Sequence, residues 1–119
     1  MQHMEEKTVS PPEEIKQHLN FRDKDGRIYT LTPSTYKHIK RDHSITNPCA
    51  FIEDTLFKPF AIVEDKTKHD RWIYHKDYTS KLFKVVVACT RERRIKTAFV
   101  SDEVKGGVPI WIDKKNLIK

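Results

Sequence analysis

The sequence predicts an α+β domain in which N-terminal helices pack on one antiparallel sheet of four to five strands. The chain has 119 residues, a length typical of one domain with a single core. Helix start and stop signals fill its first half, whereas runs rich in β-branched and aromatic residues, joined by short polar links, fill its second half. We expect residues 1–9 to be a flexible N-terminus and residues 10–119 to form the single domain.

The N-terminal part of the chain predicts a short helix followed by a hairpin. Ser10, with Glu13 three residues later, has the pattern of a capping box and predicts a helix over residues 10–19. Gly26 ends a polar stretch and can adopt a positive φ angle without steric cost. We therefore expect residues 20–31 to form a small hairpin that turns at Gly26.

Two further helices are predicted by capping residues that stand directly before a proline. Thr32 caps the first of these helices, in which Tyr36 and Ile39 lie one turn apart and form the inner face. Asn47 caps the second helix, and Pro59 ends it.

Strand signals dominate the chain after these helices. The links between the runs are short and polar, which favours antiparallel neighbours. The continuous apolar run Val85-Val86-Val87 is typical of a central strand that is covered on both faces. We expect strands over residues 61–64, 71–78, 81–89 and 93–101, and an additional edge strand or covering segment over residues 109–112.

Charge and composition restrict the partners and the compartment. A formal net charge of +6, from 23 Lys and Arg against 17 Asp and Glu, favours a polyanionic partner, although a basic protein with no such role fits as well. Cys49 and Cys89 lack a CxxC spacing, so a reduced intracellular chain is the simpler interpretation, with a single disulfide as the alternative. No apolar leader and no apolar run of about 18 residues occurs. We expect a cytoplasmic protein that does not enter a membrane.

The stretch Tyr36 to His43, which reads YKHIKRDH, concentrates groups that can carry chemistry. His38 and His43 are five residues apart, so on a helix they diverge by about 140°, and no cysteine or carboxylate cluster completes a metal site. We therefore predict no metal site. A solvated helix face explains the cations of this stretch, and a partly buried histidine explains His43. An acid–base site is the third interpretation, in which Arg41 binds a phosphate.

Several short motifs in a fixed order resemble a known family. These motifs are YKHIKRDH at 36–43, FIEDTLFKPFAI at 51–62, WIYHKDY at 72–78, LFKVVVA at 82–88 and IKTAFV at 95–100. Over residues 21–101 the chain therefore resembles the phage-associated members of the barnase/EndoU/colicin/RelE-like (BECR) nuclease superfamily.

The resemblance implies a metal-independent ribonuclease with no cofactor. Carried over by position, its catalytic residues would be His38, Arg41, His43 and Thr97. Its substrate-binding residues would be Tyr74, Lys76, Lys81 and Lys84, although a solvated face explains Lys81 and Lys84 more simply. Thr97 would be an orienting hydrogen-bond donor, and its alternative is an ordinary strand threonine.

Such an enzyme would cleave RNA through attack by the 2′-hydroxyl on the adjacent phosphorus, which leaves a 2′,3′-cyclic phosphate. RNA would be its substrate, and an acidic inhibitor or antitoxin protein would be a natural partner for its basic surface. The alternatives are a catalytically inactive nucleic-acid-binding domain and a protein-interaction domain of a phage or mobile element.

The alternation of the last long strand bears on Thr97. Ile95, Thr97 and Phe99 are expected to share one face of that strand. If Ile95 and Phe99 pack on the helices, Thr97 lies close to the helix that carries the histidines.

Overall fold

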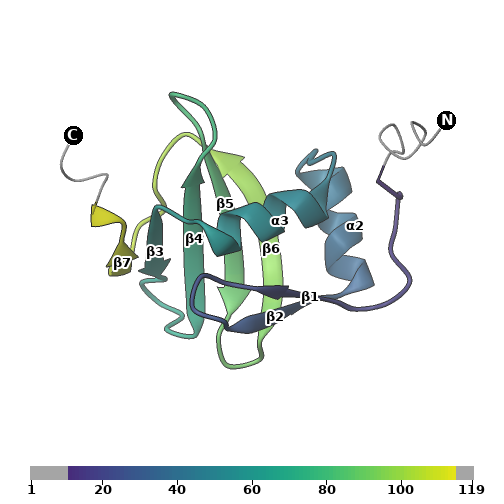
Figure 1. Ribbon diagram of the computed structural model, residues 1–119, viewed down its shortest axis with the longest axis horizontal. Helices are drawn as coiled ribbons and strands as arrows, with labels where there is room; N and C mark the ends of the chain where they lie inside the picture. The colour runs from purple at the N-terminus through teal and green to yellow at the C-terminus, as the bar shows by residue number, and fades with distance from the viewer. Residues whose placement is uncertain (1–10, 115–119) are drawn as a thin grey trace, which may run out of the picture.

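A computed structural model describes residues 11–114, which form one seven-stranded sheet and two helices. The predicted N-terminus at residues 1–9 lies outside the described residues. The strand order in the sheet is β1-β2-β6-β5-β4-β3-β7 (Figure 1). In chain order the elements are β1 (Leu19–Arg22), β2 (Ile28–Leu31), α2 (Pro33–Asp42), α3 (Pro48–Phe57), β3 (Ala61–Glu64), β4 (Arg71–Asp77), β5 (Phe83–Cys89), β6 (Arg94–Ser101) and β7 (Val108–Ile112).

The predicted fold class is wrong, because the sheet is mixed and has seven strands instead of four or five antiparallel ones. β2 pairs with β6 in parallel at Thr30 and Arg94, and the Thr30 N–H donates to the Arg93 carbonyl at 2.9 Å. β7 adds an antiparallel strand on the other side, next to β3. Local signals predict that a segment is extended, but they do not say which strand it will pair with.

The helix predicted over residues 10–19 is also wrong. Residues 11–18 contain no helix, and Leu19 opens β1, where partly buried and exposed residues alternate with a period of two. Two prolines and few apolar residues leave the capping pattern without a helical stripe to bury. The segment instead runs past α2, where the Tyr36 hydroxyl donates to the Pro12 carbonyl at 2.6 Å.

Most other predicted elements are confirmed. Thr32 and Asn47 cap α2 and α3, and each side chain accepts a hydrogen bond from a backbone N–H of the first helical turn. The hairpin around Gly26 forms β1 and β2, with Gly26 at a φ of 90°. β3, β4, β5 and β6 form the expected antiparallel meander.

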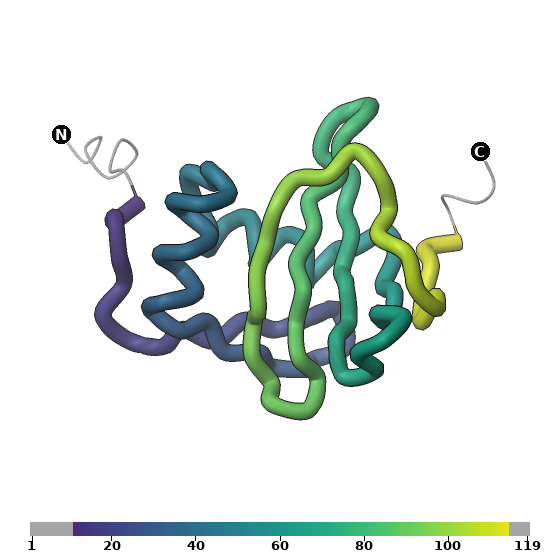
Figure 2. Tube along the Cα trace, turned by 180° about the vertical axis from the view of Figure 1, so that it is seen from behind, coloured from purple at the N-terminus to yellow at the C-terminus, as the bar shows by residue number. Residues whose placement is uncertain are grey.

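The two faces of the meander are covered differently. α3 packs on one face, where Tyr74, Val86 and Ala98 lie side by side in the main core (Figure 1). Seen from behind, β4, β5 and β6 have no described helix in front of them (Figure 2). We call this second face the open face. It carries Ile73 of β4, Val87 of β5, and Thr97 and Phe99 of β6, because directly paired residues point to the same side.

Two segments border the open face. β2 pairs with β6 only at Arg94, the first residue of that strand, and α2 also packs alongside β6. Residues 102–107 cross from β6 toward β7 over the ends of β5 and β4 (Figure 2).

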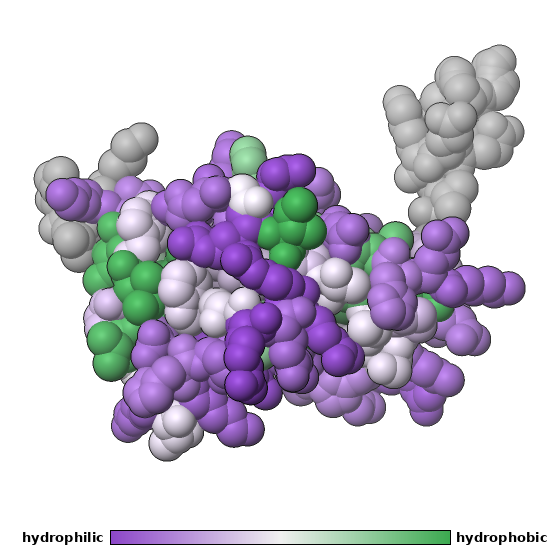
Figure 3. Space-filling view, turned by 90° about the horizontal axis from the view of Figure 1, so that it is seen from below, coloured by the Kyte–Doolittle hydropathy of each residue, from purple (hydrophilic) through white to green (hydrophobic). Residues whose placement is uncertain are grey.

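The surface at β7 is the most apolar part of the side drawn in Figure 3. Val108 is 57% exposed and Ile110 is 41% exposed on this strand. Neither helix within residues 11–114 is long and apolar enough to cross a membrane.

Candidate active site at the edge of the open face

The end of α2 brings the two histidines together. Tyr36 and Ile39 are buried and fix the rotation of the helix. The helix ends at Asp42, so His43 is its C-cap, with a φ of −111° and a ψ of 4°. The divergence expected along an unbroken helix therefore does not apply. The rings of His38 and His43 meet edge to face with centroids 4.9 Å apart, and we call them the imidazole pair.

The imidazole pair touches the sheet through His43. The His43 ring lies 5.8 Å from the ring of Phe99, which belongs to the open face. Thr97 stands two residues earlier on the same strand and faces the same way, opposite Val87. Its hydroxyl is buried and has no hydrogen-bond partner among the described residues. His38 and His43 thus meet where α2 borders β6, and Thr97 lies on the same face of β6 as Phe99, two residues away.

Asp42 orients the first imidazole. His38 Nδ1 lies 2.8 Å from Asp42 Oδ2, one helical turn away. A carboxylate can only accept, so Nδ1 carries the proton in this contact. In the neutral ring this leaves the lone pair on Nε2, which is the arrangement a general base needs. Both side chains are largely exposed, so the contact orients the ring more than it stabilises the fold.

Arg41 is exposed on α2. Its guanidinium forms no hydrogen bond, ion pair or ring contact with the residues that the structure describes. A guanidinium without a protein partner has all its donors available for a phosphate.

A pocket of about 490 Å³ opens on the same face and shares Phe99 with the imidazole pair. Ile73, Val87 and Phe99 form its apolar floor. Its cations are Lys68, Arg71 and Lys105, and we call it the cationic pocket. The full lining is Asp65, Thr67, Lys68, Arg71, Ile73, Val87, Phe99, Lys105 and Gly106.

Lys105 is held over this pocket by a buried histidine. The backbone N–H of Lys105 donates to Nε2 of His75 at 2.9 Å, and His75 is fully buried. Burial lowers the pKa of His75 to about 4, and the charge of Lys105 acts in the same direction. The imidazole is therefore neutral at physiological pH and accepts this bond. The Lys105 ammonium lies 5.7 Å from the centre of the Phe99 ring.

Asp65 lies in the same pocket as an ionised carboxylate. It accepts hydrogen bonds from the backbone N–H groups of Thr67 and Lys68 and from the Thr67 hydroxyl. These bonds lower the pKa of Asp65. Among the lining residues, one carboxylate stands against three cations, while Asp70 and Glu103 outside the lining pair with Arg71 and Lys105.

The predicted substrate-binding residues do not lie on the open face. Tyr74 is fully buried on the α3 side of the sheet, so its assignment to a substrate surface is wrong. Lys76 and Lys84 pair across β4 and β5 on that same side. Strand alternation explains this placement, because positions 74 and 76 face away from positions 73 and 75.

The two lysines on the α3 side already have partners within the protein. Lys84 Nζ lies 2.6 Å from Asp54 Oδ2 of α3, and Lys76 Nζ donates to the Lys58 carbonyl at 3.1 Å. Lys81 is exposed in the turn between β4 and β5. These contacts give Lys76 and Lys84 a structural role under α3.

The alternation predicted for the last strand also needs correction. A β-bulge interrupts β6 between Ile95 and Thr97, which pair with consecutive residues of β5. Ile95 consequently turns into the core beside Ala98, while Thr97 and Phe99 remain on the open face. A bulge has no reliable signature in a single sequence.

Sequence reasoning missed the cations of the cationic pocket. Arg71 could have been found, because strict alternation from Ile73 places it on the open face. Lys68 and Lys105 lie in connections whose course depends on packing, so no local pattern indicated them.

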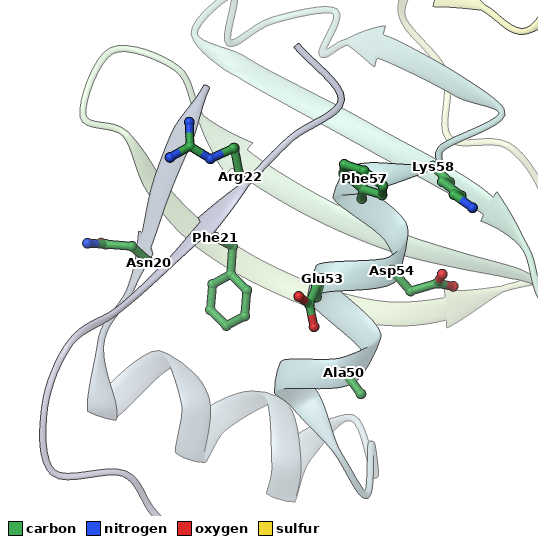
Figure 4. A pocket seen from close by; sticks show the side chains of 8 residues that line it. All are labelled: Asn20, Phe21, Arg22, Ala50, Glu53, Asp54, Phe57 and Lys58. Carbon is green, nitrogen blue, oxygen red and sulfur yellow. The ribbon is translucent and has the colours of Figure 1, made fainter. Parts of the chain in front are cut away.

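A larger groove of about 680 Å³ runs between β1 and α3 (Figure 4). It lies on the α3 side of the sheet, away from the imidazole pair. Its charged lining residues are Arg22 on β1 and Glu53, Asp54 and Lys58 on or directly after α3, so two cations balance two carboxylates. We place the candidate active site on the open face, where positive charge and the histidines occur together.

Within residues 11–114, no group of three or more His, Cys, Asp and Glu side chains is arranged to hold a metal ion. Cys49 and Cys89 are both free thiols. Comparisons with protein-family models, curated proteins and solved structures found no match.

Proposed function

We propose that the protein is a metal-independent endoribonuclease of the toxin or phage-effector type, whose active site is the imidazole pair at the edge of the open face. One observation carries the proposal. Two imidazoles have centroids 4.9 Å apart, and one of them, His43, contacts Phe99 of a pocket lined by three cations. Paired proton-transfer groups beside an anion-binding surface are what RNA cleavage by the 2′-hydroxyl requires.

The reaction assigns a role to each side chain. One imidazole takes the proton of the 2′-hydroxyl as its oxygen attacks phosphorus, and the other protonates the leaving 5′-oxygen. His38 suits the base, because Asp42 engages its Nδ1. Arg41 binds the phosphate, and Thr97 supplies an orienting hydroxyl once the substrate is bound. The product carries a 2′,3′-cyclic phosphate, and DNA, which lacks the 2′-hydroxyl, is not cut.

The partners and compartment follow from the same proposal. RNA is the substrate, and an acidic inhibitor or antitoxin protein would cover the basic open face. A cytoplasmic location would give the enzyme access to RNA.

The test is cleavage of a defined single-stranded RNA by purified protein in EDTA. We expect cyclic-phosphate ends with the wild type, and a loss of at least about 100-fold in rate with His38→Ala or His43→Ala, which is the usual size of a general acid or base contribution. His18→Ala is the matched control, because His18 is exposed on the segment before β1. Cleavage that survives both active-site substitutions would refute the imidazole pair as the active site.

A catalytically inactive nucleic-acid-binding domain is the second candidate. The buried hydroxyl of Thr97 and the exposed position of Arg41 favour it, because neither side chain makes a hydrogen bond or ring contact with the imidazole pair. Intact RNA that is retained in a salt-sensitive way would identify this function. Failure to bind any polyanion at low salt would leave a protein-interaction domain.

A further inference from the structure

We propose that the cationic pocket binds one nucleotide of a single-stranded nucleic acid, with its base on the apolar floor and its phosphate at the cationic rim. The inference rests on the proposed function, which it deepens by assigning a subsite to the nucleotide next to the scissile linkage. The floor of the cationic pocket is apolar and partly exposed. Val87 and Phe99 are partly exposed and lie diagonally across β5 and β6 on the open face, with the more buried Ile73 beside Val87. A flat apolar area that includes an aromatic ring is what a nucleobase stacks on.

The three cations of the pocket come from different parts of the chain. Lys68 comes from the turn before β4, Arg71 from the first position of β4, and Lys105 from the crossing segment after β6. The entry to β4 and the segment after β6, which are far apart in sequence, thus bring cations to one rim. Asp70 and Glu103 offset part of this charge, at 3.2 Å from Arg71 and 3.8 Å from Lys105. The cations retain further N–H donors, from which a bound anion would accept.

The cationic rim is held in place by hydrogen bonds and ion pairs within the protein, before any ligand binds. His75 holds the backbone of Lys105, and the Asp65 carboxylate holds the backbone of Lys68. Asp70 accepts from Arg71 at 3.2 Å and also pairs with Arg91 at 3.3 Å, so its charge is shared between two guanidinium groups. Groups that are fixed before binding lose less entropy when a ligand arrives.

The cationic pocket adjoins the imidazole pair through Phe99. The Phe99 ring contacts His43, and the Lys105 ammonium lies 5.7 Å from its centre. A base on this ring would lie between the proton-transfer groups and a cation. A nucleotide bound there would be adjacent to the linkage that the histidines cleave.

The experiment separates binding from cleavage by using single-stranded DNA. A fluorescently labelled eight-nucleotide DNA lacks the attacking hydroxyl, so its anisotropy reports binding alone. We expect Lys105→Ala, Arg71→Gln and Phe99→Leu each to raise Kd at least about fivefold. The two charge substitutions should also reduce the salt slope by about 0.7 for each phosphate that the variant no longer neutralises.

Matched controls come from elsewhere on the surface. Lys16→Ala removes an exposed cation from the segment before β1, and Phe57→Leu truncates an exposed phenylalanine on α3. Both should bind the DNA like the wild type. Circular dichroism melts of each variant identify any loss of binding that reflects unfolding.

Each outcome bears on one proposal. Pocket variants that bind like the controls would overturn the subsite, even if RNA is cleaved by the imidazole pair. Weakened binding in the pocket variants, together with uncut RNA, would uphold the subsite and refute the nuclease. Nucleoside monophosphates that compete as well as the oligonucleotide would overturn the subsite for a strand, because the pocket would then be a site for free nucleotides.

Discussion

The Tyr74 hydroxyl donates a hydrogen bond of 2.7 Å to Oδ2 of Asp23, although the two residues are 51 positions apart in the chain. Asp23 is 1% exposed and also accepts from the Arg27 guanidinium at 3.1 Å. The Tyr29 hydroxyl lies 3.0 Å from that of Tyr74. Burial and these hydrogen bonds raise the pKa of Tyr74, so its phenol stays protonated. The contact fastens the turn of the β1–β2 hairpin to β4, an interior strand of the sheet.

Tyr74→Phe should lower the free energy of unfolding by about 1–3 kcal/mol, because a buried carboxylate loses a donor while the ring still fills its space. Urea unfolding followed by circular dichroism measures the change. Tyr78→Phe is the control, since Tyr78 is 56% exposed and should change stability by less than about 0.5 kcal/mol. Equal effects of the two substitutions would show that the buried network contributes little.

His75 should make stability depend on pH between about 4 and 6.5. Its folded pKa of about 4 lies below the ordinary value of 6.5. Within this window the unfolded chain binds a proton that the folded protein excludes, so stability is complete above the window and falls as the pH decreases. Lowering the pH from about 7 to about 5 should remove about 2 kcal/mol through this residue.

Urea unfolding of His75→Gln at both pH values tests this expectation, because glutamine can accept from Lys105 but does not titrate. The variant should lose less stability than the wild type on acidification. His69→Gln is the control, since the His69 side chain is 75% exposed. Parallel losses in the wild type and His75→Gln would assign the pH dependence to other groups.

Gly107→Ala should destabilise the protein by at least about 2 kcal/mol. Gly107 has a φ of 148°, and an added Cβ would lie 1.9 Å from the Glu64 carbonyl oxygen of β3. Gly106→Ala is the matched control, because its Cβ would meet only the Lys66 side chain at 3.5 Å, an ordinary contact. Thermal unfolding compares the two variants, and similar melting temperatures would contradict the close packing of residue 107 on β3.

The Lys84–Asp54 pair should contribute to stability and leave RNA cleavage unchanged. The Lys84 side chain is 15% exposed, whereas that of Asp54 is 43% exposed, so solvent screening limits the coupling to about 0.5–1 kcal/mol. A double-mutant cycle with Lys84→Met and Asp54→Asn measures it by urea unfolding. A large fall in kcat/KM for Lys84→Met, with the fold intact, would return Lys84 to the active site.

The histidines show how far local reasoning reaches. Alternation and capping predict α2 and its buried Tyr36 and Ile39, and they place Thr97 in the last long strand. The helix end at Asp42, which turns His43 toward His38 and Phe99, depends on packing against β6. The resemblance predicted that His38 and His43 share one site. Their five-residue spacing instead predicted that they diverge on an unbroken helix.

The substrate-binding assignments show where local reasoning failed. Alternation predicts that Tyr74 and Lys76 share a side, but it predicts neither the register that adds Lys84 to that side nor which side α3 covers. Once α3 lies on that side, Tyr74 is buried and Lys84 pairs with Asp54. The opposite side consequently remains open for Arg71 and Lys105.

The sequence by itself determined where most helices and strands begin and end, because caps, prolines and alternation act between residues that are close in the chain. It also determined a basic surface and the presence of paired histidines on one helix. The tertiary structure alone decided that the β1–β2 hairpin and β7 extend the sheet, which face stays open, and which cations converge on it. Those outcomes depend on pairing and packing between distant segments, and local residue patterns do not encode them.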